Sequence, residues 1–154
     1  MSYSLENEKK KCVIGMAIRT SNENFHKEAP ILWERFHKAA SSAKIANRLN
    51  DAILAVYSEY DGDYTLPFTY LIGYEVENLH AIAEGMKGIE VSEASYAVFT
   101  ASGPFPESMA KAWNRIWNAD LKRLYTVDFE IYTSDFNPFN PQHHPEVKIY
   151  IAVE

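Results

Sequence analysis

Residues 53–60 read ILAVYSEY, a run of aliphatic, β-branched and aromatic side chains that is typical of a β-strand. The turn-forming residues Asp61, Gly62 and Asp63 follow, and residues 68–77 (FTYLIGYEVE) form a second run of the same kind. Two such runs on either side of a turn predict an antiparallel hairpin with a somewhat long loop. The first half of the chain is therefore expected to contain antiparallel sheet.

A strand and a helix are predicted before this hairpin. Residues 12–19 (CVIGMAIR) have the composition of a strand. Trp33, Phe36, His37 and Ala40 fall at positions i, i+3, i+4 and i+7, which is the spacing of one face of an amphipathic helix. We expect this helix to begin near Pro30, because the fixed φ angle of proline suits a first turn. The first half then has the order strand, helix, strand, strand.

The same order returns after a predicted linker at residues 78–88. Proline at the first helical position and an acidic residue in the first turn are both favourable, so Pro106 and Glu107 predict the start of a second helix. The predicted elements of the second half are a strand ending in YAVFT (96–100), this helix, the strand DFEIYTSDF (128–136) and the final strand VKIYIAV (147–153).

The two halves also align residue by residue. On the helices LWERF (32–36) aligns with AWNRI (112–116), and on the following strands AVYS (55–58) aligns with EIYT (130–133). A period of this length is too long for a solenoid repeat. The sequence therefore predicts an α+β fold of two pseudo-symmetric β-α-β-β repeats, with an antiparallel sheet, two main helices and a ligand cleft between the repeats.

The length of 154 residues indicates one domain. Residues 1–11 are expected to form a polar, flexible N-terminal tail, and residues 12–154 the domain itself. Within the domain, the first repeat is predicted at about residues 12–78 and the second at about residues 89–154. There is no signal-peptide pattern and no apolar run near the roughly 20 residues of a membrane span, so a cytoplasmic location without a membrane partner is expected.

Charge and residue types argue against several classes of function. The formal net charge of −6 disfavours direct binding of nucleic acid. Cys12 is the single cysteine, which excludes an internal disulfide and a site with several cysteine ligands. His143 and His144 lack an HExxH arrangement and a clear third ligand, so no metal is predicted. With no glycine-rich phosphate loop, no cofactor is predicted either.

Glu130 is the residue that the repeat does not explain. Strand alternation places Phe129 and Ile131 on one face, and Glu130 and Tyr132 on the other. The first repeat has Ala55 at the matching position, so the fold does not require an acid there. Two interpretations remain open: a solvated residue on a half-exposed strand, or a carboxylate in a pocket that raises its pKa or awaits a cation. An aromatic content of 14% is compatible with an aromatic-lined cleft.

In the order and spacing of its motifs the chain resembles the gyrase-inhibitor-like (GyrI-like) effector-binding domains, the small-molecule-sensing modules of AraC-type and MerR-type transcription regulators. No helix-turn-helix region accompanies the motifs, so the chain is expected to be a stand-alone version of the domain. The matching stretches are residues 53–60 with the turn after them, 70–76 (YLIGYEV), 96–103 (YAVFTASG), 113–117, 128–132 (DFEIY) and 147–153.

This resemblance implies a site for a small lipophilic, and in this family often cationic, ligand. It implies that Glu130 projects into the cleft, that Tyr132 faces the pocket, and that Tyr150 is the family's aromatic residue on the last strand. By element alone, it extends the site to three more aromatic residues, Trp33, Phe99 and Trp113. The helical pattern by itself favours a core position for Trp113 and Trp117.

The predicted function is small-molecule effector binding related to transcription regulation, and two alternatives stay open. Some relatives of this fold hydrolyse electrophilic small molecules, and Glu130 with Tyr150 or Tyr132 could position and activate water. A protein partner, either a regulator or DNA gyrase as for the namesake of the family, is the other alternative. Strand alternation does not decide whether Tyr57, Tyr70 and Tyr74 face the cleft or the surface.

Overall fold

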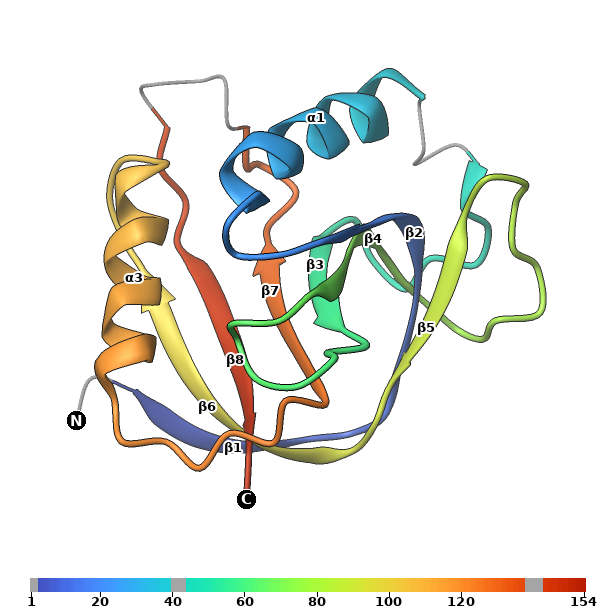
Figure 1. The fold of residues 1–154 in the computed structure, drawn as a ribbon. Coiled ribbons are helices and arrows are strands. Elements are labelled where there is room, and N and C mark those ends of the chain that lie inside the picture. The colour runs from blue at the N-terminus through green and yellow to red at the C-terminus, as the bar shows by residue number, and fades with distance from the viewer. Residues whose placement is uncertain (1–2, 40–43, 138–142) are drawn as a thin grey trace.

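The structure is a computed structural model that describes residues 3–39, 44–137 and 143–154. These residues form one antiparallel sheet of eight strands in the order β1-β6-β8-β7-β3-β4-β2-β5, with the helices α1 and α3 packed against it (Figure 1). The predicted α+β class is confirmed. The elements are β1 (Ser4–Glu8), β2 (Lys11–Thr20), α1 (Phe25–Lys38), β3 (Ile53–Ser58), β4 (Phe68–Val76), β5 (Lys87–Val91), β6 (Ala94–Ala101), α3 (Glu107–Asn118), β7 (Val127–Tyr132) and β8 (Val147–Val153).

The strand order is symmetric about its centre, as two related repeats require. Strands β3, β4 and β2 lie on one side of the central boundary, and their counterparts β7, β8 and β6 lie on the other side in the same succession. In the central β3–β7 pair, Ala55 lies opposite Glu130. These two residues also align between the repeats, so the pseudo-two-fold axis passes between them. Glu130 thus stands at the axis of the molecule.

The N-terminal segment differs from the expected flexible tail. Strand β1 pairs with β6, and β2 already begins at Lys11. The lysines that suggested a tail have acidic neighbours, because Lys10 Nζ lies 3.8 Å from Glu90 and Lys11 Nζ lies 3.6 Å from Glu8. Strand β1 forms because it pairs with β6, about ninety residues away in the sequence. The polar residues of β1 alone do not indicate this pairing.

Strands β1 and β2 continue one another, as do β5 and β6. Glu8 pairs with Ala94 and Lys11 pairs with Val91, which is one continuous register across both pairs of strands. They form a long two-stranded ribbon along the bottom of Figure 1. Strand β1 leads the first repeat but pairs with the second, and β5 leads the second but pairs with the first. Each repeat is therefore a β-β-α-β-β unit that lends its first strand to the other.

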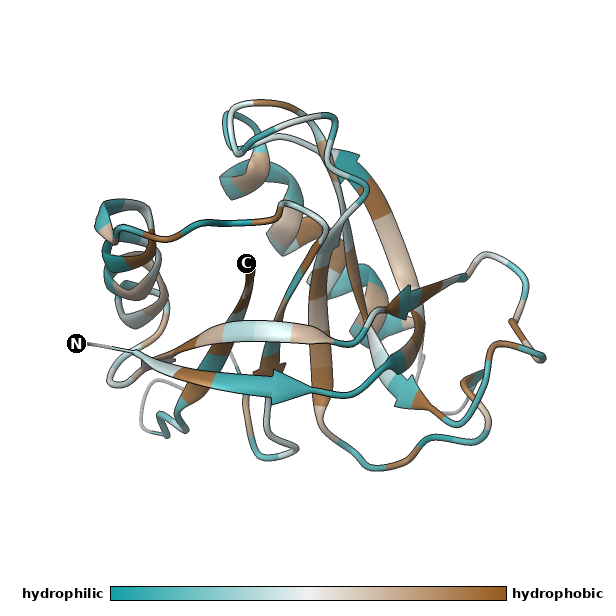
Figure 2. Cartoon of the chain, turned by 90° about the horizontal axis from the view of Figure 1, so that it is seen from below, coloured by the Kyte–Doolittle hydropathy of each residue, from teal (hydrophilic) through white to brown (hydrophobic). Residues whose placement is uncertain are grey.

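Both faces of the sheet carry a hydrophobic core. On the face covered by the helices, Leu32 of α1 and Ile116 of α3 are almost fully buried. On the opposite face, Val56, Phe129 and Tyr150 belong to a second cluster. Figure 2 shows the hydrophobic residues concentrated on the central strands and the hydrophilic residues along the outer segments. Two buried faces explain why the central strands are apolar at nearly every position.

The first helix begins one turn earlier than the sequence suggested. Helix α1 starts at Phe25, so Pro30 lies inside it and not in its first turn. Proline removes one backbone hydrogen bond, the one to the carbonyl of His26, and both residues lie on the exposed side of the helix. Helix α3 starts at Glu107 directly after Pro106, close to the prediction. Within the described residues, neither helix is long and apolar enough to cross a membrane.

Candidate ligand-binding site

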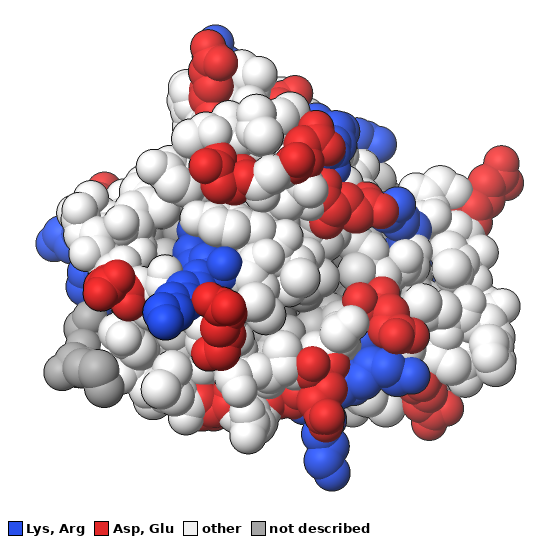
Figure 3. All heavy atoms as spheres, turned by 60° about the horizontal axis from the view of Figure 1, so that its bottom comes forward, with Lys and Arg blue, Asp and Glu red and all other residues white. Residues whose placement is uncertain are grey.

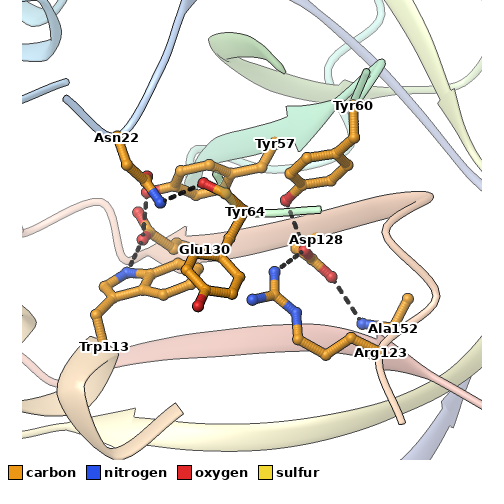
Figure 4. Close-up of polar contacts among 9 residues, drawn as sticks. All are labelled: Asn22, Tyr57, Tyr60, Tyr64, Trp113, Arg123, Asp128, Glu130 and Ala152. Atoms are coloured by element: carbon orange, nitrogen blue, oxygen red, sulfur yellow. Dashed lines mark hydrogen bonds and ion pairs between the residues drawn. The ribbon is translucent and has the colours of Figure 1, made fainter. Parts of the chain in front are cut away.

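A cavity of about 660 Å³ lies between α1 and α3, over strands β3, β4 and β7. The loop between β3 and β4 borders it, where Asn22 Nδ2 donates a hydrogen bond of 2.7 Å to the carbonyl oxygen of Tyr64 (Figure 4). Most of its wall is aromatic. The helices contribute Trp33, Trp113 and Trp117, and the strands contribute Tyr57, Tyr70 and Tyr132.

Glu130 lines this cavity with a side chain that is almost completely buried, at 1% exposure. Its Oε1 accepts a hydrogen bond of 2.6 Å from the hydroxyl of Tyr132. Its Oε2 accepts two, each 2.8 Å long, from the hydroxyl of Tyr57 and from Nε1 of Trp113 (Figure 4). All three donors are neutral groups. Among the described residues, no lysine, arginine or histidine forms an ion pair with Glu130.

The pKa of Glu130 is raised, and burial is the cause. The hydrogen bonds from Tyr132, Tyr57 and Trp113 favour the ionised carboxylate and oppose this shift. Burial, followed by the charge of Glu130, raises the pKa of both tyrosines well above its ordinary value. The tyrosines therefore remain protonated donors at neutral pH. The site holds a carboxyl group in a buried, aromatic environment, and no cation among the described residues compensates its charge.

A second buried carboxylate, Asp128, lies two residues earlier on the same face of β7. Its Oδ2 accepts hydrogen bonds from the hydroxyl of Tyr60 at 2.6 Å and from Nη2 of Arg123 at 2.8 Å. Its Oδ1 accepts a hydrogen bond of 2.8 Å from the backbone N–H of Ala152 (Figure 4). Burial raises the pKa of Asp128, and the charge of Arg123 is the largest of the effects that oppose it. Here the compensating cation is built into the protein.

Four of the six predicted site residues line the cavity. Glu130 and Tyr132 come from β7, Trp33 from α1 and Trp113 from α3. Nε1 of Trp33 donates a hydrogen bond of 3.0 Å to the hydroxyl of Tyr70, whereas Nε1 of Trp113 donates to Glu130. The structure thus brings together residues from both repeats around one carboxylate.

Tyr150 and Phe99 lie outside the cavity. Tyr150 pairs with Phe129 in the β7–β8 ladder and stacks on its ring at 4.5 Å, on the sheet face opposite to Glu130. The residue of β8 that pairs with Glu130 is Ile149. Phe99 is fully buried in the core and packs against Tyr3. Strand alternation separates Tyr150 from the site, so the pair Glu130–Tyr150, considered above for hydrolysis, is not formed.

Several cavity residues were not predicted. Strand alternation does not place Tyr57, but the repeat does, because Tyr57 aligns with Tyr132 and both tyrosines donate to Glu130. The helical pattern of Trp117 favours a core position, but its side chain is half exposed and lines the cavity. Arg123 lies between α3 and β7 and belongs to none of the sequence motifs. Its place at the cavity becomes evident only from the ion pair that it forms with Asp128 in the structure.

Two surface features of the described residues do not have the character of a binding site: a histidine–aspartate pair and the mixed-charge face around the strand ribbon. Nε2 of His143 lies 2.7 Å from Oδ2 of Asp135, but the described residues contain no group of three or more side chains that could hold a metal ion. The face around the strand ribbon carries acidic and basic side chains side by side (Figure 3). This mixture, with the net charge of −6, does not have the character of a nucleic-acid-binding patch.

A family model described as "Integron-associated effector binding protein" (Cass2) matches residues 4–153. The chain belongs to this effector-binding family. The "Putative transcriptional regulator protein YobU" of Bacillus subtilis (strain 168) is 32% identical over 147 residues, which are 91% of this chain and 90% of that protein. The resemblance to the gyrase-inhibitor-like effector-binding domains is thereby confirmed, and with it the assignment to effector-binding domains of the transcription-regulator type.

Solved structures of similar fold agree with this family. The integron cassette protein from the mobile metagenome of Vibrio cholerae is 25% identical, with a TM-score of 0.78 over 99% of this chain and 96% of that one. The structure of SAV2435 bound to tetraphenylphosphonium has a TM-score of 0.77 and 19% identity, over 100% of this chain and 94% of that one. At 19% identity, the similarity to SAV2435 shows that the two proteins share a fold.

Proposed function

We propose that this protein binds small lipophilic cations in the cavity and that Glu130 supplies the counter-charge. The observation that carries this proposal is the environment of Glu130, which is 1% exposed and bonded only to neutral donors. In this role the protein would sense effectors in transcription regulation, together with a separate regulator as its partner.

A cation lowers the free energy of this site in two ways. An ionised carboxylate that is removed from water without a partner is costly, and a bound positive charge offsets that cost. The faces of Tyr57, Tyr70 and the tryptophans add cation–π attraction and apolar contact for the body of the ligand. A cavity of about 660 Å³ lies within the size range of small-molecule sites. Neutral analogues of the same shape lose the charge contribution.

Two of the similar proteins support this choice of function. SAV2435 was solved with tetraphenylphosphonium, which is a cation with an apolar aromatic surface. YobU carries the description of a transcriptional regulator. We favour binding over hydrolysis, because both oxygens of Glu130 already accept hydrogen bonds from protein donors and Tyr150 lies on the other face of the sheet.

Three probes of similar shape but different charge test the proposal: tetraphenylphosphonium, tetraphenylborate and neutral tetraphenylsilane. We expect the phosphonium to raise the melting temperature and the other two to have little effect, because only a ligand that prefers the folded state stabilises it. Replacing Glu130 by glutamine should weaken phosphonium binding about 10- to 100-fold in isothermal titration calorimetry, which corresponds to the loss of one charged contact.

The matched control is Glu90→Gln, which changes the net charge equally at an exposed residue of β5. It should bind the phosphonium like the wild type. Equal affinity of the wild type and Glu130→Gln for the phosphonium would sink the proposal. So would equal affinity of the wild type for the cation and the anion.

A further inference from the structure

Arg123 is a cationic side chain in the wall of the same cavity. It is held by Asp128, which precedes Glu130 by two residues on one face of β7. Two residues along a strand correspond to about 7 Å, so the guanidinium anchor and the Glu130 carboxylate are separated by a distance that a small organic molecule can span. Figure 4 shows Asp128 with Arg123, and Glu130 further along β7.

The guanidinium has more donors than the protein uses. Arginine carries five N–H donors. Among the described residues, the recorded hydrogen bond from Arg123 is the one from Nη2 to Asp128, and the buried Nε has no partner. The side chain is only 8% exposed, and its guanidinium lies 4.4 Å from the centre of the Tyr125 ring. Because Arg123 lines the cavity and uses few of its donors within the protein, a ligand atom that accepts a hydrogen bond from its guanidinium is favoured.

Asp128 fixes one end of the guanidinium through its hydrogen bond with Nη2. Both Asp128 oxygens already receive other donors, from Tyr60 and from the backbone of Ala152. The ion pair therefore orients Arg123 in the cavity wall and leaves its remaining donors for a ligand. The nearby acids decide the charge of that ligand group, because an anionic oxygen would be repelled by Asp128 and Glu130, whereas a neutral oxygen would not.

We propose that Arg123 forms a second polar subsite, which donates a hydrogen bond to a neutral oxygen of the ligand while Glu130 binds its cationic end. The preferred ligands are then lipophilic cations that also carry a carbonyl or ether oxygen. This subsite deepens the function proposed above and rests on it.

The test compares hexyltriphenylphosphonium with an analogue that carries a ketone near the end of its alkyl chain. Both probes are cations of nearly equal size, and they differ in the one acceptor. We expect the wild type to bind the ketone about tenfold more tightly, which is the size of one hydrogen bond to a charged donor. A third analogue that ends in a carboxylate should bind less tightly than the ketone.

The variant that removes the subsite is Arg123→Met combined with Asp128→Asn. It deletes both charges together, and the asparagine can still accept from Ala152 and donate to the Tyr60 oxygen. We expect it to bind both phosphonium probes with equal affinity, and that affinity should still fall when Glu130→Gln is added. If this variant does not fold, the wild type provides a second readout: infrared absorption of the ¹³C-labelled ketone should move to lower wavenumber on binding.

The possible failures are distinct. If neither phosphonium binds, the cation-binding function falls and the subsite falls with it. If both bind with equal affinity to the wild type, or if the preference for the ketone survives in the double variant, the cation site stands and the Arg123 subsite is refuted. An unshifted carbonyl band in the wild-type complex would also overturn the subsite.

Discussion

Glu130 and Asp128 are two buried carboxylates on one face of one strand, and each accepts three hydrogen bonds. They differ in the charge of their donors. One of the donors to Asp128 is the Arg123 guanidinium, whereas all donors to Glu130 are neutral. Asp128 is thus complete within the protein and holds two segments together. Glu130 is held by the same number of hydrogen bonds, but no cation among the described residues balances its charge.

This comparison separates structural from functional burial of charge. Burial raises the pKa of both carboxyls, but only for Asp128 does a protein cation oppose the shift. The charge of Asp128 is paired with Arg123 within the protein. The charge of Glu130 can instead pair with a cationic ligand in the cavity. Removing the charge should therefore affect a different property at each residue: the stability of the fold at Asp128 and the binding of a cation at Glu130.

The largest expected contrast is between Asp128→Asn and Glu130→Gln. An asparagine at residue 128 must turn its NH2 group toward another donor, either Arg123 or the Ala152 N–H. We therefore expect a loss of about 3 kcal/mol in the free energy of unfolding. A glutamine at residue 130 can accept from Tyr57 and donate to the Tyr132 oxygen, so its cost should stay below about 1 kcal/mol. Urea denaturation at neutral pH measures both. Similar losses in the two variants would contradict the distinction.

The pH dependence of Glu130 is the next largest expected effect. Because its folded pKa is raised, the ligand-free folded state binds more protons than the unfolded state above the ordinary value of 4.5. The contribution of Glu130 to stability is therefore fully present below that pH and is lost as pH rises through the folded pKa. Cation binding needs the ionised form, so affinity should rise with pH in this window, by up to about tenfold per unit.

Calorimetric titrations with tetraphenylphosphonium across this pH range would measure the effect, and stability curves of the wild type minus Glu130→Gln would isolate the stability contribution. Affinity in Glu130→Gln should be independent of pH. A wild-type affinity that is flat, or that falls as pH rises, would show that Glu130 is not the counter-charge.

The smallest effect is expected from the two equivalent tryptophans. Trp113→Phe removes one donor to Glu130, so it should move the midpoint of the pH profile for cation binding upward, by less than about one pH unit. Trp33→Phe removes a donor to Tyr70 and serves as the matched control, because it should leave that midpoint in place. If both variants shift the midpoint equally, the individual hydrogen bond to Glu130 is not what sets it.

The repeat and the equivalence of Glu130 with Ala55 could be predicted from the sequence, whereas the direction of the Glu130 side chain could not be decided from the pattern alone. Alignment of AVYS with EIYT relates Ala55 to Glu130, and the structure pairs these two residues across the central strands. The same alignment contains the pair Tyr57 and Tyr132. This information is available because internal duplication leaves a local pattern, which needs no knowledge of distant contacts.

The remaining features depend on contacts between distant segments. The first strand is polar and precedes lysines, and only its register with β6 makes it a strand. Tyr150 lies on β8, the strand that pairs with β7. Its neighbour Ile149 pairs with Glu130, so strand alternation places Tyr150 on the other face, beside Phe129. Arg123 lies in an irregular segment, where no periodicity indicates the direction of a side chain.

The exchange of lead strands and the central Ala55–Glu130 pair have a consequence for how such a site can arise. In a dimer of identical half-length chains, the residue at this position would face its own copy across the axis, so two glutamates would lie directly opposite each other. Like charges in that position are destabilising. Joining two halves in one polypeptide removes this constraint, since each copy can then diverge. A solitary carboxylate on a symmetry axis is a feature that two diverged halves can carry and a dimer of identical halves cannot.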